Sequence, residues 1–502
     1  MENTAKEKLA FLKGELKKIK TYSHALAIMG FDFETCAPRD AREEEGETIS
    51  FFSNEAFKIE TSDEMKEAIV CLYGHKDDLE PLDRVLINNM YDDYLKSKNV
   101  APETQLRWAQ IENKAYIDWH EAKERSDFSI FEKSLSNMLE ISKENVSLRE
   151  NALPDFYDNL LSDCEKGVLQ KDLDVFFSEL KSGLIDLIGR IKNSKHFIRT
   201  DFLSRKVPIY KQEQFSRYLL ELNGYDFNKG YLTTTEHPFT SPVAENDARV
   251  TTHYYEDMFL SNIYSVIHEG GHAIFMQNEP AEDHAHFIND NVSNGMHESV
   301  SRFYENVIGR SEEYVHLIYP KLMEMFGDEL GDVSERELYE AINVVVPSLI
   351  RTEADEVTYG LHIVIRYEME KLICSGKIKI SDVPQKWNEL YTEYLGVTPD
   401  SDKTGVLQDV HWSGGFGYFP SYALGNAYNA MYVKEISKDI DFKGAIRSGD
   451  FNAINGWMKE HVFKKANILT PKEWLYDLTG KTLTAKDFLE YLNEKYTKIY
   501  ML

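Results

Sequence analysis

The feature that most constrains this 502-residue chain is the segment His268-Glu269-Gly270-Gly271-His272. Four residues make about one helical turn, so both imidazoles project from one face of a helix and can grip one metal ion. Glu269 lies beside them, where a general base for an attacking water is needed. Apolar residues flank the motif. The pattern predicts a buried helix over 261–279 with a catalytic metal site; a helix with two structural histidines is the alternative.

A catalytic zinc site usually has three protein ligands, so the sequence must supply a third. The metzincin pattern would need Gly at 275 and His at 278, but the chain has Phe275 and Asn278. We expect Glu298, on a helix over 296–309 that follows a polar loop, to complete the site. The rival ligands are His284, His286, His297 and Glu305. We expect His284 and His286 to face solvent, and Glu305 to orient a ligand histidine.

Glycines 270 and 271 weaken a helix by roughly 1 kcal/mol each relative to Ala. Their presence indicates either close approach of another backbone or tight helix packing.

Helical periodicity dominates the rest of the chain, which contains only 14 prolines. We predict helices over 130–148, 170–193 and 348–373, and a strand or hairpin over 243–260. Ser334 and Glu337 form a capping-box pattern for a helix that Pro347 interrupts and that resumes as far as about Cys374, with Gly376 as the stop. The expected fold class is mainly α, with a small β hairpin or sheet near the metal helix.

The net charge of -28 disfavours binding to nucleic acid and to anionic membranes. The N-terminus is interrupted by Lys and Glu and lacks the apolar centre of a secretory signal. The four cysteines are widely separated, which predicts neither disulfides nor a metal knuckle. These features favour a reduced, cytoplasmic setting and predict no membrane partner.

Two further segments carry candidate site residues. Arg351, Asp355, Thr358 and His362 would share one face of the 348–373 helix, either as an Arg351–Asp355 pair or as an active-site wall that binds a carboxylate. The glycine-rich segment 405–420 cannot be regular helix through 413–417. It either places His411 and Tyr418 as donors to an oxyanion or is a structural aromatic loop.

Taken together, the motifs resemble those of the carboxypeptidase Taq family of metallocarboxypeptidases. The matching blocks, in the family's order, are His237-Pro238-Phe239, Asp247-x-Arg249-x-Thr251, His268–His272, His297-Glu298-Ser299, Ile350-Arg351-x-x-Ala354-Asp355, and Gly405-x-x-Gln408-Asp409-x-His411-Trp412. The resemblance is firm over about 225–430. Phe31 replaces an expected Trp and His253 a frequent Arg, but no departure touches a predicted metal ligand.

The resemblance implies one helical peptidase domain over 1–502 with a deep groove, in which 1–200 form groove-wall or lid helices, 225–430 the catalytic core and 431–502 C-terminal helices. It implies a homodimer that removes single residues from free peptide C-termini, with broad specificity and poor cleavage of C-terminal proline. It places Zn²⁺, with Co²⁺ as a substitute, on His268, His272 and Glu298, and makes Glu269 the base. Arg351, Arg249 and His237 become candidates for substrate binding, and His411 and Tyr418 for catalysis.

Two other functions remain open on the sequence. An oligoendopeptidase of similar helical fold would tolerate a blocked C-terminus. A non-catalytic metal- or peptide-binding protein would bind without hydrolysis, but it would have no need of Glu269.

Overall fold

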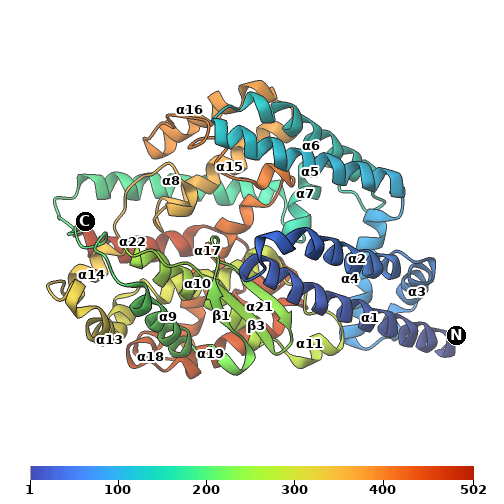
Figure 1. Ribbon diagram of the computed structural model, residues 1–502, viewed down its shortest axis with the longest axis horizontal. Helices are drawn as coiled ribbons and strands as arrows, with labels where there is room; N and C mark the ends of the chain where they lie inside the picture. Colours follow the sequence, from blue (N-terminus) through green and yellow to red (C-terminus); the bar gives the residue numbers. More distant parts are fainter. Residues whose placement is uncertain (1) are drawn as a thin grey trace.

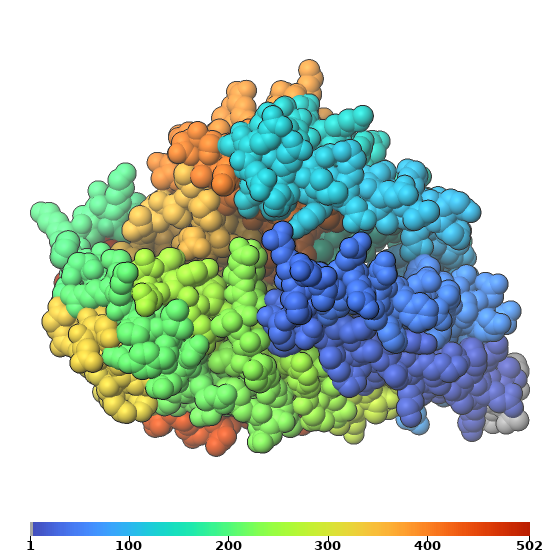
Figure 2. All heavy atoms as spheres, in the orientation of Figure 1, coloured from blue at the N-terminus to red at the C-terminus, as the bar shows by residue number. Residues whose placement is uncertain are grey.

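The computed structural model describes residues 2–502, which are mostly helical (Figure 1). The N-terminal helices (blue) form one end of the molecule, and a second group (cyan) lies above them in Figure 1. The first nine helices are α1 Glu2–Thr35, α2 Arg42–Glu60, α3 Asp63–Tyr73, α4 Pro81–Ser97, α5 Pro102–Arg125, α6 Ser129–Leu148, α7 Phe156–Cys164, α8 Gln170–Asn193 and α9 Ile209–Asn223, of which α9 (green) lies apart from both groups in Figure 1. Figure 2 shows the surface hollowed between the blue helices and the cyan and orange ones above them.

Most of the remaining helices lie around the small sheet and the centre of the fold, whereas α16 lies at the top in Figure 1. Their bounds are α10 Phe259–Gln277, α11 Ala281–Ala285, α12 Asn294–Arg302, α13 Glu312–Leu330, α14 Glu335–Ala341, α15 Tyr359–Cys374, α16 Val383–Leu395, α17 Phe419–Asp439, α18 Phe442–Ser448, α19 Phe451–Met458, α20 Lys464–Ala466, α21 Pro471–Thr479 and α22 Lys486–Tyr500. A π-helix, Phe303–Ile308, continues α12 directly.

The sheet has three strands in the order β1-β3-β2, with β1 Leu232–Thr234, β2 Thr240–Ala244 and β3 Asp247–Thr252. Strand β3 pairs parallel with β1 and antiparallel with β2, and both β2 and β3 pack on α10. The predicted hairpin is therefore present, although it begins at Thr240 and its second strand ends at Thr252. Parallel pairing across a distant segment explains why β1 carried no local hairpin signal.

Two apolar cores hold these elements. The larger core runs from α5 to α22 and contains α10, α15 and α17. The smaller joins α1, α3 and α4 through residues such as Leu12, Met65 and Leu72, and it includes Ile288 from the segment after α11. The N-terminal helices thus have a core of their own. They contact the rest of the fold through β2, which packs on α10, and through Ile288 in the segment after α11.

The predicted helix over 348–373 is wrong in its first turns. Only Arg351–Glu353 form a short 3₁₀ turn, and α15 begins at Tyr359. The reason is local: the carboxylate of Asp355 accepts from the backbone N–H groups of Val357 and Thr358 and from the Thr358 hydroxyl. Such side-chain bonds compete with helix continuation. Arg351 and Asp355 therefore share no helical face.

Other helix boundaries agree with the sequence patterns. The capping box of Ser334 and Glu337 is present, but α14 already ends at Ala341, before Pro347. Gly376 follows the end of α15 with φ +68°, as its role as a stop requires. All four cysteines are free. Within residues 2–502, every helix is too short or too polar to cross a membrane.

Candidate metal centre

Two histidines and one carboxylate converge on one point between α10 and α12. Glu298 Oε2 lies 3.7 Å from His268 Nε2 and 3.5 Å from His272 Nε2. One ligand atom from each of the three residues falls within 4.8 Å of the others, and this is the only such group of three or more among the residues that the structure describes. Two histidines and one carboxylate are a ligand set that catalytic metal sites in hydrolases use.

The close approach of α10 and α12 brings Glu298 to the histidines. A Cβ atom on Gly271 would lie 2.8 Å from Ser301 Cα, so only glycine allows this contact with the backbone of α12. On its other side, α12 packs on α17, where a Cβ on Gly425 would lie 3.0 Å from Glu298 Cγ. The glycine at 271 therefore serves close backbone approach, one of the two explanations that the sequence allowed.

A network of charged side chains fixes His268. Its Nδ1 lies 2.9 Å from Glu305 Oε2, which leaves Nε2 facing Glu298. Arg302 donates to Glu298 at 2.8 Å and to Glu305 at 3.2 Å, and Arg310 donates to Glu305 at 3.4 Å. Glu305 thus contacts a histidine of the site as expected, and it does so from the π-helix that follows α12.

The electrostatics of the centre favour a cation. Burial alone would lower the pKa of His268, but Glu298 and Glu305 together raise it to about 9. Burial raises the pKa of Glu305, yet Arg302 and His268 outweigh it and lower that pKa to about 2. The pKa of Glu298 is also held well below its usual value against burial, by His268 and Arg302. Ionised carboxylates around the imidazoles fit a bound divalent ion.

Glu269 points from the same helix turn and is held by the sheet. The hydroxyl of Thr240, at the start of β2, lies 2.7 Å from Glu269 Oε2 and 2.8 Å from its backbone oxygen. The carboxylate is almost entirely buried, with 9% of the residue exposed. The sheet therefore sets the orientation of this carboxylate beside the two histidines.

Arg351 lies in a buried cluster of charges and aromatic rings. It donates through Nε to Asp409 at 2.9 Å and through Nη1 to the Tyr359 hydroxyl at 3.2 Å. Asp409 also pairs with Arg366. The Arg351–Asp355 pair is therefore wrong, and the partner is Asp409 from the glycine-rich segment.

A chain of contacts joins Arg351 to the metal centre. Arg302, which holds Glu298, lies 4.5 Å from the ring centroid of Tyr359, the same tyrosine that Arg351 binds. Arg351 in turn lies 4.7 Å from the ring centroid of Tyr422. Arg351 is thus one tyrosine removed from the group that orients Glu298.

His411 and Tyr418 lie together in the loop before α17. Their ring centroids are 5.5 Å apart, and His411 Nε2 lies 3.2 Å from the Tyr422 hydroxyl. Burial lowers the pKa of His411 to about 4, so the imidazole is neutral near pH 7. Burial, with a contribution from the charge of Glu298, raises the pKa values of Tyr418 and Tyr422. The loop is irregular, as expected, with Gly415 and Gly417 at positive φ.

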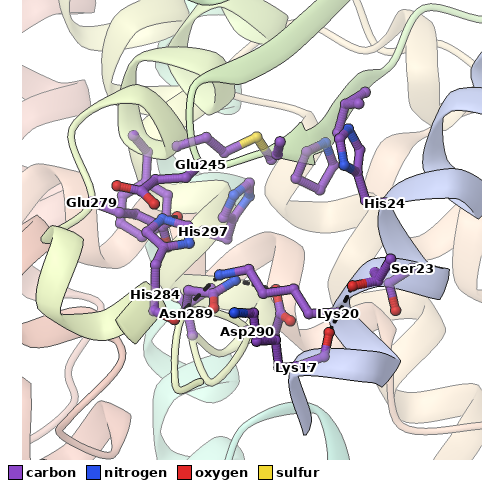
Figure 3. Close-up of a pocket in the computed structure, with 17 residues that line it drawn as sticks. Lys17, Lys20, Ser23, His24, Glu245, Glu279, His284, Asn289, Asp290 and His297 are labelled. Atoms are coloured by element: carbon purple, nitrogen blue, oxygen red, sulfur yellow. Dashed lines mark hydrogen bonds and ion pairs between the residues drawn. The ribbon is translucent and has the colours of Figure 1, made fainter. Parts of the chain in front are cut away.

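A cavity of about 490 Å³ adjoins the metal helix. Figure 3 shows it between α1, β2, α10 and the segment around α11, with Lys20 extending from α1 toward His284. Its wall includes His297, whose ring stacks on that of His272 at 4.4 Å. The expectation that His284 faces solvent is wrong: only 7% of it is exposed, and its Nε2 lies 3.4 Å from Glu279. His286 is partly exposed and pairs with Asp83 at 2.6 Å.

Comparison with known proteins identifies the chain. The family described as carboxypeptidase Taq (M32) metallopeptidase matches residues 11–496. The chain belongs to this family. It is 39% identical to carboxypeptidase 1 of Bacillus subtilis and 34% identical to thermostable carboxypeptidase 1 of Thermus thermophilus, over 97% and 94% of this chain and 97% and 95% of those proteins. The crystal structure of an M32 carboxypeptidase from Deinococcus radiodurans superposes with a TM-score of 0.95 at 29% identity, covering 99% of this chain and all of that one. The protein is therefore an M32 metallocarboxypeptidase, a hydrolase.

Two predicted substrate-binding residues of this M32 enzyme lie away from the Arg351 cluster. Arg249 pairs with Asp247 at 2.7 Å on β3 and lies over the Phe31 ring. His237 is exposed in the segment between β1 and β2. Within residues 2–502, neither Arg249 nor His237 forms a hydrogen bond with Asp409 or Tyr359, the partners of Arg351.

Three residues that contact the candidate site residues were missed from the sequence. Arg302 carried a usable signal, because it lies four residues after Glu298 and can pair with it on one helix face. Thr240 and Tyr359 carried none, because they reach Glu269 and Arg351 through tertiary contacts.

Proposed function

We propose that this M32 enzyme releases single residues from free peptide C-termini, with broad specificity and poor cleavage of C-terminal proline, and holds zinc on His268, His272 and Glu298. The convergence of these three residues between α10 and α12 carries the proposal. Zinc in such a site supplies Lewis-acid activation of water and of the scissile carbonyl. Co²⁺ is the expected substitute, because sites of this ligand type accept several divalent ions.

The roles of the chain's own groups follow from their positions. Glu269, oriented by Thr240, accepts the proton of the attacking water and passes it to the leaving amine. His411, neutral near pH 7, and Tyr418 donate hydrogen bonds to the oxygen that gains negative charge. Arg351 remains cationic beside Asp409 and binds the substrate carboxylate, while Arg249 and His237 contact the substrate from the sheet side.

Free and amidated peptides distinguish this function from its alternatives. N-blocked peptides that differ only in a free or amidated C-terminus are incubated with the enzyme, and products are followed by mass spectrometry. Stepwise loss of residues from the free acid alone, abolished by a chelator, is expected. Internal cleavage of both would indicate an endopeptidase. Metal binding without cleavage of either would indicate a non-catalytic binding protein.

We further propose that the enzyme is a homodimer, a property that the family resemblance implied. Light scattering coupled to gel filtration tests it, with a mass near twice 58.2 kDa expected and a mass of one chain contradicting it.

A further inference from the structure

A buried carboxylate outside the metal centre has neutral partners only. Glu370, on α15, is 1% exposed. It accepts hydrogen bonds from the Tyr157 hydroxyl at 2.7 Å, from the Gly417 backbone N–H at 3.0 Å and from Trp412 Nε1 at 3.1 Å. Among residues 2–502 it makes no ion pair within 4.0 Å. An ionised carboxylate buried without a cation is costly, and burial accordingly raises the pKa of Glu370 to about 7.

Two of these three donors belong to the loop that carries His411 and Tyr418. Trp412 follows His411 directly, and Gly417 directly precedes Tyr418. Glu370 Oε1 accepts from Trp412, which follows His411, and Oε2 accepts from Gly417, which precedes Tyr418. The carboxylate therefore spans the turn and ties both candidate donors to α15.

The loop has little regular structure to hold it otherwise. Residues 411–413 form a single 3₁₀ turn, and Gly415 and Gly417 adopt φ of +133° and +94°. A Cβ on Gly417 would lie 2.6 Å from the Leu160 backbone oxygen, so the segment is also pressed against α7. Ring contacts with Phe419 and Tyr422 also hold His411 and Tyr418, and Glu370 adds a hydrogen bond at each end of the segment between them.

We propose that Glu370 is a positioning residue for catalysis, acting through the loop to aim His411 and Tyr418 at the developing oxyanion. This inference rests on the proposed function. Donors that act on the transition state affect kcat, whereas groups that bind the substrate equally in both states affect KM. Loss of Glu370 should therefore appear in kcat.

Glu370→Gln and Tyr157→Phe form a matched pair. In Glu370→Gln, an amide NH₂ replaces one carboxylate oxygen. This donor then faces a second donor, either Gly417 N–H or Trp412 Nε1, so one of the two hydrogen bonds to the loop is lost. Tyr157→Phe removes a bond to the same buried carboxylate but leaves both loop bonds intact. We expect Glu370→Gln to lower kcat on a free-acid peptide by about 10- to 100-fold, with KM and zinc content within twofold of wild type. Tyr157→Phe should keep kcat within about threefold.

Retention of wild-type kcat by Glu370→Gln would overturn the proposal. So would an equal loss of kcat in Tyr157→Phe, because the effect would then belong to the buried cluster in general. If Glu370→Gln does not fold, Trp412→Phe removes the hydrogen bond to Glu370 Oε1 together with part of the packing on Trp387 and Phe419. A kcat lowered beyond that of Tyr157→Phe supports the proposal, and an unchanged kcat overturns it. Wild-type enzyme that releases no C-terminal residue would instead refute the proposed function.

Discussion

Replacing Glu305 with Gln should weaken metal binding without removing any proposed ligand. Glu305 Oε2 lies 2.9 Å from His268 Nδ1 and helps to raise the pKa of that imidazole to about 9. Gln keeps the size and one acceptor oxygen but loses the charge. Groups that hold a ligand histidine in this way typically contribute about 10- to 100-fold to metal affinity, or about 1.4–2.7 kcal/mol. The negative charge of Glu305 also stabilises a proton that competes with the metal for His268. It stabilises a divalent ion more, because the ion carries twice the charge.

The assay is a competition titration of the apoenzyme with zinc and a chromophoric chelator at pH 7.5. Glu324→Gln is the matched control, because Glu324 is an exposed residue of α13 whose one ion pair within residues 2–502 is with Lys321. We expect Glu305→Gln to raise the zinc dissociation constant at least tenfold and Glu324→Gln to leave it unchanged. Equal dissociation constants for wild type and Glu305→Gln would refute the reasoning that Glu305 supports the metal site through His268.

Three further changes test other parts of the structure. Gly271→Ala should lower the free energy of unfolding in urea by about 1–3 kcal/mol, because the added Cβ would lie 2.8 Å from Ser301 Cα. Gly327→Ala is the control, because its Cβ would meet nothing within 4 Å. Equal free energies of unfolding for the two variants would contradict the close contact at Gly271. Glu165 directly follows α7, is 2% exposed and accepts from the Gly295 backbone N–H. Burial raises its pKa to about 7, so its stabilising contribution is complete below pH about 4.5 and is lost as pH rises through 7. Glu165→Gln should remove about 2.5 kcal/mol of the decline measured by unfolding at pH 5 and 8, and an unaltered pH dependence would count against it. Arg351→Met should lower kcat/KM on free-acid peptides at least about 30-fold, roughly 2 kcal/mol, and unchanged kinetics would exclude Arg351 as the carboxylate anchor.

The geometry of the metal centre was predictable because its signals are local. His268 and His272 are one turn apart, and Glu298 lies in the next long helical pattern along the chain, although α11 stands between α10 and α12. The glycine at 271 also hinted at the backbone contact that the structure contains. Spacing alone specified the two histidines, whereas the choice of Glu298 over its rival ligands also rested on the family resemblance.

The surroundings of Arg351 were not predictable in the same way. The spacing of Arg351 and Asp355 suited a helical pair, but Asp355 bonds to the backbone of the next residues and delays the start of α15. The true partner, Asp409, is 58 residues later in the chain. Likewise, Thr240 reaches Glu269, and Glu370 reaches Trp412 and Gly417, only through tertiary packing. Contacts of this kind leave no periodic signal in one sequence.

The central claim is that Glu269 is the base of a metal centre formed by its neighbours on α10 and α12. The most direct measurement determines zinc content and turnover of Glu269→Gln in the same preparation, beside wild type. Glu269 is not one of the three proposed ligands, so the variant should retain one zinc per chain and lose at least about 1,000-fold in kcat. Turnover at the wild-type rate would contradict the assignment of the base, and loss of zinc from the variant would contradict the proposed ligand set.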